Sequence, residues 1–216
     1  MTMSNFFQIP AAIISMWVVM AIIIIFSIIA TRNMKDVPTG AQNIAESSIS
    51  WILDFFGGVI GKKNTRRYFP LFATLFIFII VTNYSGLLPG AGDLFAVSTA
   101  NLSVTAALAL ISFTMTHVIG IQNRGGLGYL KSFLQPVALM LPFTLIDQVV
   151  RPFSLALRLY GNIYAEEMVT GQLRSLFPLL LPLVMQILSL IFCLIQAMVF
   201  TMLTAVYVGE AIGEEE

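Results

Sequence analysis

Long apolar runs constrain the fold of this chain more than any other feature. Residues 9–30 form the first run, and about 20 apolar residues suffice for a helix to cross the hydrocarbon core of a bilayer. No basic residue precedes this run and no small-residue cleavage site ends it, so we expect a retained transmembrane helix and not a signal peptide. Residues 68–88 and 99–121 form two further runs. With 58% hydrophobic and 10% charged residues among 216, the chain has too little polar surface for a soluble globule.

Residues 41–60 follow a different pattern, because apolar side chains interleave there with polar ones such as Glu46 and Asp54. This spacing is typical of an amphipathic helix that lies in the membrane interface. Trp51, in the same segment, is a residue type that favours headgroup depth. We therefore interpret this segment as an interfacial helix and not as a span.

Two still longer segments, residues 136–169 and 179–208, follow. At 1.5 Å per residue, each helix would be about 45–50 Å long, whereas the hydrocarbon core is about 30 Å thick. A steep tilt accommodates the excess length. The sequence predicts an all-α integral membrane protein with a single membrane domain over residues 1–216. It has about five membrane-embedded helices and one interfacial helix, and its last two helices form a long, steeply tilted hairpin.

The distribution of basic residues indicates the orientation of these helices. Residues 31–67 and 122–135 carry basic side chains, whereas residues 85–98 carry Asp93 and no basic residue. By the positive-inside rule the first two connections are cytoplasmic, which places the N-terminus outside and the C-terminus in the cytoplasm. Arg174, in the last outer turn, departs from this rule.

Residues 151–167 place four full charges in a membrane-embedded segment, where ionised side chains are costly and usually functional. On a helix, Glu166 lies near the edge of a polar stripe and Glu167 points to the opposite side. Asp147 and Arg151 of that stripe are spaced for an i,i+4 ion pair, which we interpret as structural. The stripe consists of Asp147, Arg151, Ser154, Arg158 and Asn162.

A second polar stripe follows one face of residues 179–208. Its members are neutral and can form hydrogen bonds, so this face is suited to hold water or to bind Arg158 from across the hairpin. They are Gln186, Ser189, Cys193, Gln196, Thr204 and Tyr207.

The sequence argues against several other kinds of site. The net charge of zero gives no support for a nucleic-acid partner. Cys193 and His117 each occur alone, without ligands at metal-binding spacing, so we expect no metal and no cofactor. The glycines at 125–128 lack the Lys-Ser/Thr and the preceding strand of a phosphate-binding loop. We therefore expect no nucleotide site and no enzymatic activity of the chain on its own.

Several motifs resemble the a subunits of the rotary F-type ATP synthases, the membrane stator subunits that face the c-ring. The resemblance covers the chain from about residue 68 to its end, in the order and spacing of that family. The motifs are RPFSLALRLYGN at 151–162, YAEE at 164–167, IQAMVFTMLTAVY at 195–207, NYSGLLPG at 83–90, TANLSVT at 99–105 and the ending VYVGEAIGE at 206–214.

The resemblance implies roles for single residues. Where some relatives have a histidine paired with a glycine, this chain has Ser189 and Glu166, and where many have an aspartate it has Asn101. We therefore expect the outer ion path to rely on Glu166 and Glu167 together, with Asn101, Ser103 and Ser189 near it. The essential arginine of the family matches Arg158, its functional asparagine, glutamate and glutamine match Asn162, Glu167 and Gln196, and its cytoplasmic-side residues match Ser154 and Tyr207.

The function implied by the resemblance is that of an ion-translocating stator subunit with two offset aqueous half-channels. Arg158 would be a fixed cation that forces a ring carboxylate to ionise and blocks direct leak, because guanidinium keeps its proton in a protein. The implied partners are c-ring subunits against residues 136–208, b-type peripheral stalk subunits, the rest of the ATP synthase and the lipid bilayer. The implied location is a bacterial plasma membrane.

Other interpretations stay open at this point. Asn162 and Gln196 also fit an interhelical hydrogen bond, and Glu166 and Glu167 also fit solvated acids at a helix end. Ser154 and Tyr207 also fit plain packing. Asn101 and Ser103 also fit a helix cap. For the whole chain, the alternatives are a self-contained secondary transporter and a passive membrane scaffold. No inverted repeat supports the transporter, and a scaffold leaves the charges of the hairpin without a purpose.

Overall fold

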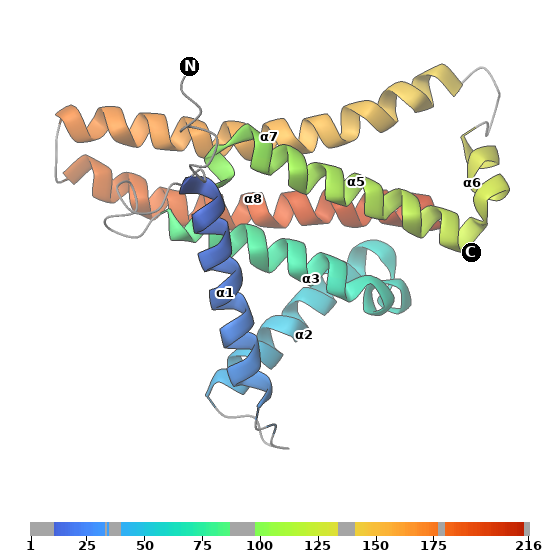
Figure 1. The fold of residues 1–216 in the computed structure, drawn as a ribbon, viewed down its shortest axis with the longest axis horizontal. Coiled ribbons are helices and arrows are strands. Elements are labelled where there is room, and N and C mark those ends of the chain that lie inside the picture. The colour runs from blue at the N-terminus through green and yellow to red at the C-terminus, as the bar shows by residue number, and fades with distance from the viewer. Residues whose placement is uncertain are drawn as a thin grey trace, which may run out of the picture.

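The computed structural model describes residues 11–32, 34, 40–86, 98–133, 141–176 and 180–213. Every regular element in these ranges is helical, which confirms the predicted all-α class (Figure 1). The elements are α1 (Ala11–Thr31), α2 (Ala41–Ile60), α3 (Lys62–Ser85), the 3-10 turn η2 (Ser98–Ala100), α5 (Leu102–Arg124), α6 (Gly126–Ser132), α7 (Leu141–Leu176) and α8 (Leu180–Ile212).

Three helices differ from the expected segments. α3 begins at Lys62, before the expected residue 68, because Gly61 at φ 77° is enough to turn the chain out of α2. α6 lies inside the expected connection 122–135, and Tyr129 holds it against α5. α7 continues past residue 169 to Leu176, because no strong helix breaker intervenes.

The expectation of a turn at Arg174 was therefore wrong, since this residue belongs to α7. Gly171 lies within the same helix, where a glycine weakens a helix but does not end it. Residues 136–140 and 179 of the two expected hairpin segments lie outside the described residues. With 36 residues, α7 is about 54 Å long, longer than the sequence predicted.

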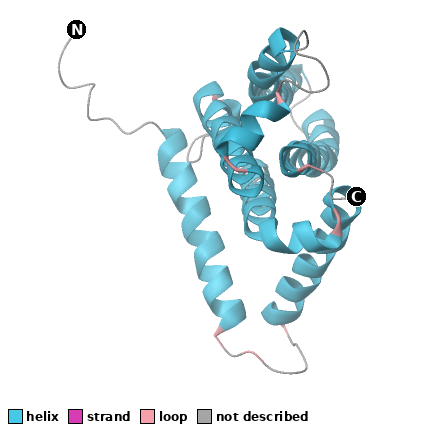
Figure 2. Ribbon diagram, turned by 90° about the vertical axis from the view of Figure 1, so that its right-hand side faces the viewer, coloured by secondary structure: helices cyan, strands magenta, loops and turns pink. Residues whose placement is uncertain are grey.

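The helices α3, α5, α7 and α8 run side by side, and α1 crosses their common direction steeply (Figures 1 and 2). Their apolar sides share one core with α2, in which Phe72, Ile79, Leu159 and Phe200 are fully buried. α1 packs on α2, α3 and η2, and the Ser98 hydroxyl donates a hydrogen bond to the carbonyl of Ala12 at 2.9 Å. The α7/α8 hairpin is thereby fixed along one side of the molecule.

Four of the described helices, α1, α3, α5 and α8, are long and apolar enough to cross a membrane. α7 is long enough but carries the four charged side chains of residues 151–167. The chain is a multi-pass integral membrane protein in which a charged helix is packed between apolar ones.

Candidate functional site

Arg158 lies at the middle of α7 with its side chain exposed on the surface of the chain. The flanking residues Leu155 and Leu159 are buried at 2% and 0% exposure and anchor this part of the helix in the core. Within the part of the chain that the structure describes, Arg158 forms no ion pair and no hydrogen bond with another residue. It is a cation without a counter-charge in its own subunit.

Large apolar side chains are exposed on both helices of the hairpin. Several of them are more than half exposed, so this surface is available to lipid or to the apolar helices of a partner. They include Phe153, Leu157, Tyr164 and Met168 in α7, and Leu183, Ile187, Ile191, Phe192 and Ile195 in α8.

Asn162, one helical turn after Arg158, connects the two helices of the hairpin. Its Nδ2 donates a hydrogen bond to Oε1 of Gln196 at 2.7 Å. Gln196 is 4% exposed, and its Nε2 has no hydrogen-bond partner in the described part of the chain. The structure therefore joins two of the expected site residues and leaves one buried amide donor beside them.

Glu166 and Ser189 form a second link across the hairpin. The Ser189 hydroxyl hydrogen-bonds the Glu166 carboxylate, and Ser189 is 2% exposed. Glu167 is exposed and turned away from this pair. The polar stripe of α8 thus faces the inside of the fold, where Cys193 and Thr204 are also buried and Thr204 shares a hydrogen bond of 2.8 Å with Ser112.

Arg151 lies in an ion cluster at the C-terminal end of α8. Its Nη2 is 3.0 Å from the Asp147 carboxylate, as expected from their spacing, and its Nη1 donates to the carboxylate of Glu210. Its guanidinium lies over the ring of Tyr207, at 4.7 Å from the ring centroid. Glu210 could not be identified as a partner from the sequence, because 59 residues separate it from Arg151.

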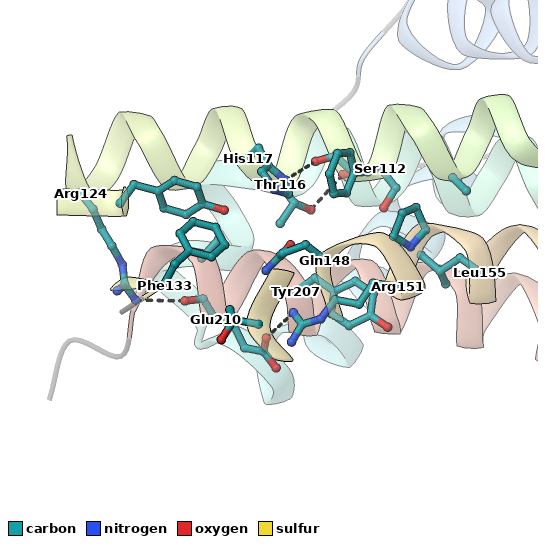
Figure 3. Close-up of a pocket in the computed structure, with 16 residues that line it drawn as sticks. Ser112, Thr116, His117, Arg124, Phe133, Gln148, Arg151, Leu155, Tyr207 and Glu210 are labelled. Carbon is teal, nitrogen blue, oxygen red and sulfur yellow. Dashed lines mark hydrogen bonds and ion pairs between the residues drawn. The ribbon is translucent and has the colours of Figure 1, made fainter. Parts of the chain in front are cut away.

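A cavity of about 290 Å³ adjoins this cluster (Figure 3). Arg151, Tyr207 and Glu210 line one part of it, and His117 and Thr116 of α5 line another. Its remaining walls come from α6 and from the start of α7. The cavity is lined by polar and apolar side chains in similar measure, and it extends from the Arg151–Glu210 pair to α5.

The other expected residues lie apart from these contacts. Asn101 caps α5, because its side chain accepts a hydrogen bond of 3.0 Å from the backbone N–H of Ser103. Ser154 is half-buried on α7 and does not line the cavity. The residues that the structure describes hold no cluster of metal-binding side chains.

A multi-pass fold in which one long helix carries charged residues at membrane depth is typical of proteins that move ions. Comparison with known proteins gives the family. The family model described as ATP synthase A chain matches residues 13–209, and the chain belongs to this family.

Two curated bacterial relatives illustrate the similarity. ATP synthase subunit a of Moorella thermoacetica is 37% identical over 202 residues, which cover 94% of this chain and 90% of that protein. ATP synthase subunit a 1 of Syntrophotalea carbinolica is 41% identical over 202 residues, which cover 92% of this chain and 84% of that protein. The resemblance to the F-type a subunits is confirmed, and the chain is a membrane subunit of an ATP synthase complex.

Proposed function

We propose that this subunit supplies two offset aqueous half-channels to a rotating ring of carboxylate-bearing c subunits, and that Arg158 separates them. A ring carboxylate that arrives protonated would lose its proton beside Arg158, because a fixed cation stabilises the ionised form. It would regain a proton in the other half-channel. The same cation would repel a proton that moved directly from one half-channel to the other.

The observation that carries this proposal is the unpaired charge of Arg158 on the exposed surface of the hairpin. A permanent cation in a membrane-embedded position needs a counter-charge. None comes from the described part of this chain, so the counter-charge comes from a partner. The exposed apolar side chains of α7 and α8 fit a ring of apolar helices as that partner.

The proposed outer path uses Glu167 and the Glu166–Ser189 pair, with Asn101 and Ser103 nearer its mouth. The proposed inner path uses Ser154 and Tyr207, and the cavity beside Tyr207 supports the presence of water there. Asn162 and Gln196 would orient Arg158, since they are bonded to each other one turn from it.

The crossing of α1 and the hairpin supports a steep tilt of the hairpin. α1 has 21 residues and is about 32 Å long, which matches the hydrocarbon thickness when the helix is upright. If α1 stands upright, the hairpin that it crosses lies far from the membrane normal. We place the subunit in a bacterial plasma membrane with the N-terminus outside, in contact with b-type stalk subunits as well as the ring.

Replacement of Arg158 by Ala in the assembled complex tests the proposal. ATP-driven proton pumping into inverted vesicles should be abolished, while subunit content and ATP hydrolysis show that the complex is assembled. Arg66→Ala is the matched control, because Arg66 is an exposed arginine of α3, away from the hairpin. Normal pumping by the Arg158→Ala complex would contradict the proposal.

The alternative functions predict other results. A self-contained transporter should move a solute when the purified chain alone is placed in liposomes, and the stator subunit should not. A passive scaffold should tolerate neutral substitutions at Arg158, Gln196 and Glu167 without loss of pumping.

A further inference from the structure

Two arginines occupy the same face of α7. Arg151 and Arg158 are seven residues apart, which is close to two helical turns, or about 10 Å along the axis. Guanidinium groups keep their proton in proteins, so both side chains are permanent cations. If both were free, this face would offer two similar stopping points to a carboxylate that moves along it.

The surroundings of the two arginines differ. Arg151 is bonded to the carboxylates of Asp147 and Glu210, is stacked on Tyr207, and keeps 23% of its side chain exposed. With both acids ionised, this cluster carries one net negative charge. Arg158 has no such partner in the described part of the chain. Only one of the two cations is therefore available to a carboxylate from outside.

Glu210 is held in place from a third helix. Arg124, the last residue of α5, donates hydrogen bonds to the backbone carbonyls of Glu210 at 3.0 Å and Ile212 at 3.1 Å (Figure 3). Gly213 then leaves α8 with φ +80°, and a Cβ at this position would lie 2.3 Å from the Arg124 guanidinium. The C-terminal end of α8 is thus arranged so that the Glu210 carboxylate reaches Arg151.

We infer that Asp147 and Glu210 are positioning residues for ion transfer. They neutralise Arg151, so that a ring carboxylate is held beside Arg158 and not beside Arg151. The inference rests on the proposed function of Arg158. It gives the ion cluster a purpose beyond joining α7 to α8, because a neutral pair of side chains could join the helices equally well.

The test removes the two acids and then the cation that they mask. In the assembled ATP synthase, Asp147→Asn with Glu210→Gln should lower ATP-driven proton pumping about tenfold, because Arg151 then competes for the ring carboxylate. Adding Arg151→Gln should restore pumping to within about threefold of the wild type, although it removes one more polar group from the cluster. The complex with Glu210→Asp, which keeps the charge, should pump nearly normally. Asp54→Asn on α2 is the control for loss of an exposed acid.

Two outcomes would overturn the inference. Pumping at the wild-type rate without the two acids would show that Arg151 needs no masking. A triple variant that pumps no better than the double variant would show that the cluster only supports the fold. If the double variant does not assemble, Glu210→Gln is compared with Glu210→Gln plus Arg151→Gln by the same criteria.

The Arg158→Ala complex separates this failure from failure of the proposed function. Normal pumping by the Arg158→Ala complex would contradict both the proposed function and this inference. If Arg158→Ala stops pumping, but Arg151→Gln does not restore pumping to the variant that lacks the two acids, only this inference fails.

Discussion

Gln196 is buried on the inner side of α8, where its Oε1 holds Asn162 and its Nε2 lacks a partner in the described part of the chain. An unpaired buried amide donor costs about 1–3 kcal/mol, so a water molecule or a partner group bonded to this Nε2 would be stabilising. It is bonded to Asn162, one turn after Arg158 on α7, so its free donor would suit a carboxylate or water held near the arginine.

The Asn162–Gln196 bond can be tested by Asn162→Ala. This change leaves the remaining polar atom of Gln196 unpaired, and we expect a loss of stability of about 1–2 kcal/mol together with slower pumping. Thermal unfolding of the purified complex and proton pumping measure the two effects. Thr114→Ala is the control, since the Thr114 hydroxyl bonds only the Leu110 carbonyl of its own helix. Equal thermal stability and equal pumping of the Asn162→Ala and Thr114→Ala complexes would contradict the expectation.

The Glu166–Ser189 pair leads to a second expectation at this scale. Ser189→Ala removes the hydroxyl that bonds the carboxylate, and Ser189→Thr keeps a hydroxyl. If Glu166 belongs to the ion path, pumping should fall about tenfold in the alanine variant and much less in the threonine variant. Equal pumping by the two variants, measured at matched subunit content, would assign Glu166 to packing.

At the scale of elements, Tyr129 anchors α6 on α5. The side chain of Tyr129 is 7% exposed and lies against Gly120 of α5, where an added Cβ would be 2.4 Å from its ring. Burial raises the pKa of the Tyr129 phenol above its usual value of 10.0. The contact between α5 and α6 closes one wall of the cavity beside Arg151.

Gly120→Ala should therefore displace α6. We expect a destabilisation of about 1–3 kcal/mol, because the ring must move away from the new methyl group. Gly126→Ala is the control, since an added Cβ at Gly126 meets nothing within 4 Å. Thermal unfolding of both variants is the measurement, and an unchanged midpoint for Gly120→Ala would show that Tyr129 is free to move.

At the scale of the whole molecule, the basic residues around α2, α3 and α6 predict the orientation in the membrane by the positive-inside rule. α1 crosses the direction of the hairpin (Figure 2), so an upright α1 would leave the hairpin steeply tilted in the membrane. A helix of about 54 Å that is tilted strongly presents a long surface at nearly constant depth, which suits contact with several ring helices.

Labelling with a membrane-impermeant maleimide tests the orientation. In a Cys193→Ser background, the exposed residues Ser103 and Lys63 are each replaced by cysteine. We expect Ser103→Cys to react in right-side-out vesicles and Lys63→Cys to react only after permeabilisation, because the positive-inside rule places Lys63 in the cytoplasm. The reverse pattern would invert the topology.

The sequence by itself determined the all-helical class, the apolar spans and the bounds of α2, because hydrophobic periodicity is a local property of the chain. It also placed Asp147 and Arg151 in contact, since residues four apart on a helix are neighbours. The family followed from motifs that depend on order and spacing alone.

Only the tertiary structure decided which polar groups meet across helices. Asn162 with Gln196, Ser189 with Glu166 and Arg151 with Glu210 are between 23 and 59 residues apart, and their contact depends on the register of α7 against α8. A shift of one residue rotates a helix by about 100°, so helical spacing restricts each side chain to a face but does not select its partner. The contact of Glu210 with Arg151 comes from this register, whereas that of Asp147 comes from spacing along α7.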